Sequence, residues 1–397
     1  MNRWLKKITK GRLGRGKGRF TRRGMIVTIM VLMLGTTANV IAMNFFRVSM
    51  EQYKAAVVTA DGFRARQLAV AGFQSGLTAL KYVPEEFLYQ QAAIKRPPAI
   101  RISPKEEAPP GDKRNYCAPA CSFRYSLDPE DGRFNVNNLV QPTTDEVNKQ
   151  WRPIFQRFFR NYDFPEPDNM VDAIIDWIDE NNNTEPGGAE NEYYSTLRPP
   201  IKIKDYRLFS LSEIAQIKGI SYKMIFSSQA PEDWKEQQEE LKFQTEAEKN
   251  LIRDHDWIPA TNLTAFIPLE GNFEDKININ AARYHVMLAL SPNMSKQSVQ
   301  ALFKFRDEEK GGYIKNLSDL KLLPEFQVKN GELSLYDELV GSGTRLSGLI
   351  KTKGEIYRIT GVGIIDPVPG SDNKPVTRKI TGLYDTVNKK LIYYSED

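Results

Sequence analysis

Oxygen-bearing side chains gather in one short stretch of the sequence, DENNNTEPGGAENE at residues 179–192. Calcium is held by about six to eight oxygen ligands, which the carboxylates, amides and backbone carbonyls of a pliable loop can supply. We therefore expect a calcium site here, formed by a set of acid and amide side chains: Asp179, Asn181, Glu190, Asn191 and Glu192. A solvated polar loop around the Gly-Gly turn is the other interpretation that this composition allows.

Few other residues could bind a metal or take part in a reaction. Cys117 and Cys121, in YCAPACS, are the only cysteines, and we expect a disulfide if this part of the chain is exported and two thiols otherwise. The two histidines, His255 and His285, are far apart in the sequence and are predicted to be structural. Two cysteines without a nearby histidine do not indicate a zinc site.

The sequence carries no enzyme signature. It has no Ser-His-Asp order, no phosphate-binding loop and no metalloprotease helix. Asp176 and Asp179 lie three residues apart on a predicted helix, where capping or ion pairing explains them more simply than acid–base catalysis. We predict a protein that is not an enzyme.

The amino-terminal end predicts a membrane anchor. Residues 1–23 hold ten Lys or Arg and no acid, so the rest of the chain is net acidic and gives no general reason to expect a polyanionic partner. The uncharged run from Met25 to Phe46 is long enough, as a helix, to cross the roughly 30 Å apolar core of a bilayer. The basic residues would stay in the cytoplasm, and everything after Arg47 would lie across the membrane.

Two places near this run could be cut. TTANVIA offers small residues between Ala38 and Ala42, as a secretory signal peptide requires. However, helix-compatible residues continue from Met25 to Val83 without a proline. The other cut lies between Gly24 and Met25, and it would leave the apolar helix as the new amino terminus.

The middle of the chain contains an internal repeat. Three blocks occur twice in the same order. They are first FNVNNL (134–139), VDAIIDWID (171–179) and LSEIAQI (211–217). They occur again as ININAA (277–282), VQALFKFRD (299–307) and LSDLKLL (317–323). Each unit predicts an asparagine-capped start, an amphipathic helix and a short serine-capped helix. The first unit is longer because residues 179–205 are inserted.

These units resemble helix-hairpin-helix modules, which bind the DNA backbone through a glycine-rich hairpin. Only the hairpin from Ile217 to Ile220 keeps a glycine. We therefore expect a scaffold without a nucleic acid partner, and the alternative function is a membrane-anchored DNA-uptake receptor. A secreted hydrolase with a signal peptide is a further alternative, against which the missing nucleophile motif and the continuous helix argue.

The carboxyl-terminal end predicts an antiparallel sheet. Residues 354–365, 376–387 and 389–396 form β-branched or alternating runs, separated by PVPGSDNKP and by Asn388. Together with the long helix they predict an α+β fold, in which a large helical segment interrupts a domain made of one helix and one sheet.

Several stretches together resemble the minor pseudopilin K family of type II secretion systems, within the type IV pilin superfamily: RRGMIVTIMVLML, RARQLAVAGFQSGL, DGRFNVNNL, DAIIDWIDENNNTEPGGAENEYY, LSEIAQIKGI and ININAA. Ordinary pilins carry Glu at the fifth residue after the cut, whereas this chain carries Ile29. Members of the pseudopilin K family also lack this Glu. The resemblance implies a basic leader at residues 1–24 and a long helix at 25–83, of which 25–46 span the membrane. A pilin-like β domain follows in two pieces, 84–137 and 333–397, and a helical insertion at 138–332 separates them.

The same resemblance implies a function. It predicts a minor pseudopilin at the tip of the periplasmic pseudopilus, anchored by one pass in the inner membrane, which initiates assembly and supports protein export across the outer membrane. Its expected partners are the type I and type J minor pseudopilins, the major pseudopilin and prepilin peptidase. The long helix would present them with an apolar face that includes Val57, Phe63, Leu68 and Leu77.

Bound calcium in the acidic stretch is a further implication of the resemblance. Family members are richer in Asp there, whereas this chain has Asn181 and Asn191, which lower the negative charge of the stretch.

Overall fold

The computed structural model describes residues 22–90, 96–102, 121–231, 254–266, 276–327, 329–330, 333–341, 343–344, 346–366 and 374–397. The chain divides into two units, Met1–Asp61 and Gly62–Asp397. Helix α1 (Arg22–Tyr82) belongs to both, since its first forty residues lie in the first unit and the rest in the second.

The described part of the first unit is entirely α1. Among the described residues, this is the one helix whose length and composition suit a membrane span. The hydroxyls of Thr28 and Thr37 donate to the carbonyls of Gly24 and Met33 at 2.9 and 3.0 Å, so they are satisfied within the helix. The predicted continuous helix is confirmed, and its apolar part has the features of a single-pass anchor.

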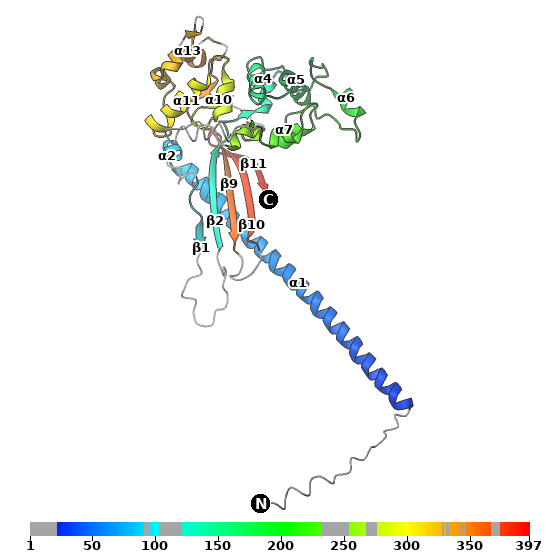
Figure 1. Ribbon diagram of the computed structural model, residues 1–397. Coiled ribbons are helices and arrows are strands. Elements are labelled where there is room, and N and C mark those ends of the chain that lie inside the picture. The colour runs from blue at the N-terminus through cyan, green and yellow to red at the C-terminus, as the bar shows by residue number, and fades with distance from the viewer. Residues whose placement is uncertain are drawn as a thin grey trace, which may run out of the picture. The chain divides into compact units, whose positions relative to one another are not determined.

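The second unit contains a five-stranded antiparallel sheet in the order β1-β2-β9-β10-β11 (Figure 1). Its strands are β1 (Ile100–Ile102), β2 (Cys121–Pro129), β9 (Ile356–Ile365), β10 (Val376–Asp385) and β11 (Lys390–Glu396). The predicted carboxyl-terminal strands are therefore confirmed, and the fold class is α+β.

Residues 62–82 of α1 pack against this sheet at very short range. A Cβ at Gly361 would overlap backbone atoms of Ala69 and Phe73, and a Cβ at Gly363 would overlap the carbonyl of Ala65. Glycine lets two backbones approach more closely than any other residue permits. The helix and β9 are therefore in direct backbone contact at these two positions.

The helical part of the second unit lies between β2 and β9 and gathers at one end of the sheet (Figure 1). Its helices are α4 (Arg152–Arg160), α5 (Pro167–Ile178), α6 (Asn191–Thr196), α7 (Tyr222–Phe226), α10 (Tyr284–Leu290), α11 (Lys296–Lys304), α12 (Pro324–Gln327) and α13 (Leu335–Val340). Shorter helical turns are η1 (Val136–Leu139), η2 (Leu211–Gln216), η3 (Asp254–Trp257), η4 (Pro259–Thr261), η5 (Phe305–Glu309) and η6 (Leu317–Leu322). Short strand pairs join β3 (Phe134–Asn135) to β4 (Leu263–Thr264), β5 (Ile277–Asn278) to β8 (Ile350–Lys351) and β6 (Lys329–Asn330) to β7 (Leu333–Ser334).

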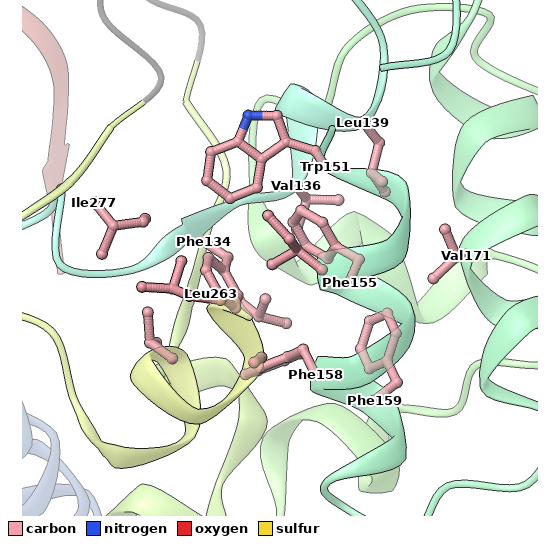
Figure 2. Packing of buried hydrophobic residues seen from close by; sticks show 14 of the residues in the cluster. Phe134, Val136, Leu139, Trp151, Phe155, Phe158, Phe159, Val171, Leu263 and Ile277 are labelled. Atoms are coloured by element: carbon pink, nitrogen blue, oxygen red, sulfur yellow. The ribbon is translucent and has the colours of Figure 1, made fainter. Parts of the chain in front are cut away.

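One hydrophobic core holds the helical part together (Figure 2). Aromatic rings meet at its centre, where the Phe134 and Phe158 centroids are 5.3 Å apart in an edge-to-face arrangement. The core extends from Phe134 to Ile350 and includes Leu335 and Leu339 of α13. The helical part is therefore longer than the predicted 138–332, because α13 packs into this core and not onto the sheet.

The internal repeat is visible in the hydrogen bonds of two buried asparagines. The amide of Asn137 donates to the Leu208 carbonyl at 2.9 Å and accepts from the Leu208 N–H at 2.8 Å. The amide of Asn280 makes the same pair of bonds with Ile314, at 2.9 and 2.8 Å. In both units the bridged residue lies two positions before the N-cap of the short helix, η2 or η6. Each asparagine thus ties the start of its unit to the end.

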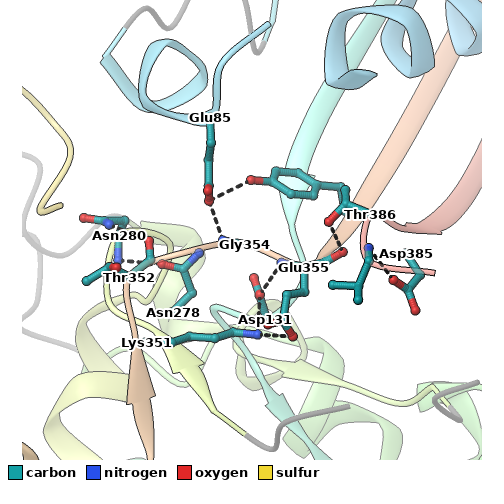
Figure 3. Close-up of polar contacts among 12 residues, drawn as sticks. Glu85, Asp131, Asn278, Asn280, Lys351, Thr352, Gly354, Glu355, Asp385 and Thr386 are labelled. Atoms are coloured by element: carbon teal, nitrogen blue, oxygen red, sulfur yellow. Dashed lines mark hydrogen bonds and ion pairs between the residues drawn. The ribbon is translucent and has the colours of Figure 1, made fainter. Parts of the chain in front are cut away.

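Two adjacent stretches of chain connect the helical part to the sheet (Figure 3). Asp131 follows β2 and Lys351 ends β8, and their side chains form a buried ion pair at 3.1 Å. The carboxylate of Asp131 also accepts from the Glu355 N–H at 2.8 Å, and Lys351 Nζ contacts the Glu355 carboxylate at 2.7 Å. From α2 (Glu85–Gln90), Glu85 accepts a hydrogen bond from the Gly354 N–H.

Replacing Asn137 or Asn280 by alanine is expected to lower the free energy of unfolding by about 2–4 kcal/mol, because the buried backbone groups of the bridged residue lose their partners. Chemical denaturation of the full chain in detergent would measure this. Asn316→Ala is the matched control, since that side chain is exposed and makes no capping hydrogen bond. Stability unchanged in both test variants would contradict the structural role of the repeated asparagines.

Candidate cation site in the first repeat

Helix α5 positions the acids of the predicted calcium loop. Its apolar face packs into the helical core, and it carries Asp172 and Asp176 one turn apart and ends at Asp179, the C-cap residue. Asp172 is paired with Arg152 at 2.6 Å, and Arg152 also pairs with Glu185 at 2.9 Å. Asp176 and Asp179 are buried as well, but their environment is different.

The loop after α5 folds back over the end of this helix. The carboxylate of Asp176 accepts a hydrogen bond from the Glu185 N–H at 3.0 Å. Gly188 lies directly against that carboxylate, which a Cβ at this position would overlap. Lys218 Nζ donates to the Gly188 carbonyl at 2.7 Å. The Gly-Gly turn is therefore packed on α5, and this closeness explains why it needs glycine.

Two carboxylates at the base of this loop have oxygen atoms without partners. Asp179 is 2% exposed and Glu190 is 7% exposed. Within the part of the chain that the structure describes, Asp179 Oδ1 and both carboxylate oxygens of Glu190 have no hydrogen-bond partner. A buried ionised carboxylate without partners is costly, so this pair needs either protons or a cation.

Their electrostatic environment points the same way. Burial raises the pKa of Asp179 to about 8, and the nearby charges of Glu190, Asp176 and Asp145 raise it as well. Burial, with contributions from Asp176 and Asp205, raises the pKa of Glu190 to about 7. Burial raises the pKa of Asp176 to about 6. The charges acting on Asp179 and Glu190 are those of other carboxylates, which a bound cation would relieve.

The donor set fits calcium in its chemistry. All the groups concerned are hard oxygen ligands, which suit Ca²⁺ and not Zn²⁺. Among the described residues, no three acid, histidine or cysteine side chains lie close enough to share one ion in this conformation. Backbone carbonyls, amides and water would therefore complete the shell around the two orphaned carboxylates.

The predicted ligands separate into two groups. Asn181 Nδ2 donates to Asp179 Oδ2 at 2.6 Å, so Asp179, Asn181 and Glu190 belong to the buried site. Asn191 and Glu192 do not, because they occupy the first turn of α6 and are exposed to solvent. These two residues therefore lie apart from the buried carboxylates.

Sequence reasoning missed three acids around the site. Asp176 accepts backbone N–H groups of the loop in place of the capping or ion pairing expected for it, and its spacing from Asp179 was the available signal. Asp145 and Asp205 act from other loops, and both have positive φ angles, 55° and 49°. No local pattern indicates that these two lie near the site.

The predicted partner face of α1 is only partly available. Phe63 is 61% exposed and Val57 is 40% exposed, but they lie about 120° apart around the helix axis. Leu68 is buried beside Ala65, and Leu77 packs against the core between α1 and the sheet. The prediction of one stripe of four residues is therefore wrong, because the helix uses Leu68 and Leu77 for its own domain.

The predicted processing and disulfide residues are placed as follows. Gly24 and Met25 lie in the first turn of α1 and are exposed. Cys121 begins β2 and is disulfide-bonded. Cys117 lies outside the described residues.

His285 behaves as a structural residue. It is buried, its ring lies 4.4 Å from the ring of Tyr162 in a stacked arrangement, and burial lowers its pKa to about 3. It is therefore neutral at physiological pH. The side chain of His255 lies outside the described residues.

Comparison with known proteins identifies the segment that holds this site. Residues 132–226 match the family model described as type II secretion system (T2SS), protein K. A putative type II secretion system protein K of Escherichia coli (strain K12) is 32% identical over 92 residues. The type II secretion system protein K of Pectobacterium carotovorum subsp. carotovorum is 28% identical over 93 residues. Each alignment covers 22% of this chain and 28% of the relative, so the chain spans little more than a quarter of the length of these relatives.

One chain of a solved structure, the GspK-GspI-GspJ complex from the enterotoxigenic Escherichia coli type 2 secretion system, aligns with this chain. It is 14% identical, with a TM-score of 0.48 over 88% of this chain and 99% of that one. The family match shows that residues 132–226, the first portion of the helical part, are similar to components of protein-secretion systems. More particularly, residues 132–226 are similar to the type II secretion system protein K family.

The stability of the protein is expected to fall from pH 5 to pH 8 in the presence of a chelator. A carboxyl group whose pKa is higher in the folded than in the unfolded chain binds more protons when folded, so ionising Asp179 and Glu190 costs about 1–3 kcal/mol of unfolding free energy. The window begins near the unfolded value of about 4 and ends near the folded pKa of Asp179, about 8.

Melting of the full chain in detergent at each pH would measure the loss. Asp179→Asn should reduce it, and the exposed Glu192→Gln should not. A wild-type loss equal to that of Asp179→Asn would contradict the raised pKa.

Proposed function

We propose that this protein is a minor pseudopilin of a type II secretion system, located at the tip of the periplasmic pseudopilus, where it initiates assembly and supports export across the outer membrane. One observation carries the proposal. A protein K domain is inserted between two strands of a sheet that packs on a long helix, and the first part of this helix is apolar enough for a membrane. This arrangement joins a helix suited to filament packing to a large globular domain.

Two features support a position at the tip. Ile29 stands where a pilin glutamate would compensate the buried amine of the subunit above, and a terminal subunit has no subunit above it. The helical part, with its core from Phe134 to Ile350, also adds a bulk that could not repeat along a tightly wound shaft.

The anchor and its processing follow from the same proposal. Prepilin peptidase would cut between Gly24 and Met25 on the cytoplasmic face, and the apolar part of α1 would hold the protein in the inner membrane. The rest of the chain would lie in the periplasm, an oxidising compartment in which a disulfide at Cys121 persists. The role is structural, and we infer no catalytic activity.

The partners would be the type I and type J minor pseudopilins, with the major pseudopilin below them. Phe63 is the most exposed of the predicted contact residues, and it lies in the part of α1 that packs on the sheet. The net acidic body and the single glycine-bearing hairpin at Gly219 give no support to a DNA partner.

Calcium would have a structural role. Asp179 and Glu190, with Asn181, would hold the ion, and the ion would neutralise carboxylates that otherwise repel one another. It would thereby fix the loop after α5 on the end of that helix.

Calcium is expected to raise the melting temperature of the full chain in detergent, because a ligand that binds only the folded state stabilises it. The double variant Asp179→Ala with Glu190→Ala should lose this rise. The matched control, Asn191→Ala with Glu192→Ala, should keep it, since those side chains are exposed. A wild-type melting temperature that does not change in millimolar calcium would refute the site.

The tip position is tested by assembly. Mixed in detergent, the full chain and the type I and J minor pseudopilins should form a hetero-trimer by light scattering. Phe63→Asp should weaken it at least tenfold, and Tyr82→Asp, an exposed aromatic at the end of the same helix, should not. Detection of this protein along whole filaments, at the stoichiometry of the major subunit, would contradict the assignment.

A further inference from the structure

A pocket of about 540 Å³ lies between the sheet and the first repeat. Its apolar lining includes Leu263 and Phe266 from the helical part and Leu383 and Ile392 from β10 and β11. Arg133 and Arg358 line it together with the hydroxyl-bearing Ser210 and Ser212. The pocket is separate from the acid cluster at the end of α5, because none of its lining residues belongs to that cluster.

Among the described residues, the positive charges at this pocket exceed the negative ones. Glu130 is fully buried and forms a bidentate contact with Arg358, with an N–O distance of 2.9 Å for Nε. Arg133 reaches the same carboxylate at 3.5 Å, which among the described residues is its one ion pair. Two guanidinium groups therefore share a single carboxylate.

The acids farther out do not compensate the second arginine. Asp128, which acts electrostatically on Arg133, is paired with Arg96 at 2.6 Å. Arg283, also close enough to act on Arg133, is paired with Asp256 at 3.1 Å. The described surroundings thus leave one positive charge without a counter-charge at the wall of the pocket. The carboxylate of a bound ligand could pair with this charge.

Exposed aromatic side chains line the pocket or lie beside its lining. Phe209 is 59% exposed and Tyr393 is 44% exposed, and both are among the lining residues. Tyr222 is exposed as well and stacks on the lining residue Phe226 with ring centroids 4.5 Å apart. Aromatic residues around a pocket, with an arginine inside it, are typical of the energetic centre of a protein–protein interface.

The pocket also adjoins an open strand. In the described part of the chain β11 pairs only with β10, and none of its residues is buried. Ile392 and Tyr393 of this edge strand line the pocket. An extended peptide that pairs with the free edge of β11 would alternate its side chains, so that every second one faces the pocket side of the sheet.

We propose that the pocket and the free edge of β11 bind an extended segment of a partner protein that presents a carboxylate among apolar side chains. The carboxylate of the segment pairs with the guanidinium of Arg133. The apolar side chains beside it contact the apolar lining of the pocket and the exposed rings of Phe209 and Tyr393. This proposal does not depend on the type of assembly, since it concerns binding by the isolated chain.

Selection of a random displayed dodecapeptide library on the immobilised full chain in detergent tests the proposal. Enriched peptides should contain one Asp or Glu flanked by aliphatic or aromatic residues at alternate positions. No enrichment, or enrichment without a preference for an acid, would overturn it. Dodecanoate is added as a competitor, and a site that binds dodecanoate but enriches no peptide would be a lipid site.

The affinity of one enriched peptide, measured by fluorescence anisotropy, gives the second test. Arg133→Gln should weaken binding at least tenfold, as should replacing the acid of the peptide by its amide. Because Arg133 is nearly buried, Phe209→Ala serves as a variant at an exposed position, and it should also weaken binding severalfold. Arg160→Gln, on the exposed side of α4, is the control and should bind as the wild type does. Equal affinity for wild type, Arg133→Gln and Phe209→Ala would overturn the proposal.

Discussion

The buried ion pair between Asp131 and Lys351 is the constraint on which the second unit depends (Figure 3). A helical part of more than two hundred residues, with its core between Phe134 and Ile350, is attached to a sheet of five strands by only two stretches of chain. The ion pair joins those stretches at their base. Burial raises the pKa of Asp131. Burial acts to lower the pKa of Lys351, but the charges and hydrogen bonds of Asp131 and Glu355 together raise it by more, so the lysine keeps its charge in a buried place. Losing Lys351 would leave Asp131 as a buried carboxylate without this counter-ion, whereas Lys351 without Asp131 would still have Glu355 as a partner.

Beyond this junction, the two repeats use the same device to close. Each unit begins with an Asn-x-Asn pattern whose second asparagine, Asn137 or Asn280, bonds the backbone ahead of the short helix. One contact joins the two repeat units to each other. Arg157 of α4 donates to the carbonyls of Ala289 and Leu290 at the end of α10, at 2.9 and 2.8 Å, so the first unit caps a helix of the second. The units are thus similar in construction but fold as one body around a shared core.

The sequence indicated the parts of the fold that have local patterns. The continuous helix, the three carboxyl-terminal strands and the paired blocks of the repeat all follow from periodicity or self-similarity, and the structure confirms them. The predicted serine cap is right for η2, whose N-cap is Ser210, and wrong for η6, whose N-cap is Asn316 with no side-chain capping hydrogen bond. The second boundary of the helical part was less accessible, because α13 has an ordinary amphipathic pattern and only its packing shows to which core it belongs. Likewise, Asp179 and Glu190 were visible as acids, but that they are buried with unpaired oxygens depends on how the loop folds over α5. The pocket is lined by several separate segments, which no linear pattern could have brought together.

The glycines of β9 have a mechanical consequence. At Gly361 and Gly363 the strand meets the backbone of α1 with no side chain between them, and Gly72 of the helix approaches the backbone of Arg124 in β2 in the same manner. Flexible side chains at such a contact would shear under load, because rotamers can change while the backbones slide past each other. Where the two backbones touch directly, no side chain can change its rotamer to let them slide. A pull or push along the axis of residues 62–82 of α1 would therefore pass to the sheet with little slippage, and helix and sheet would move as one rigid lever.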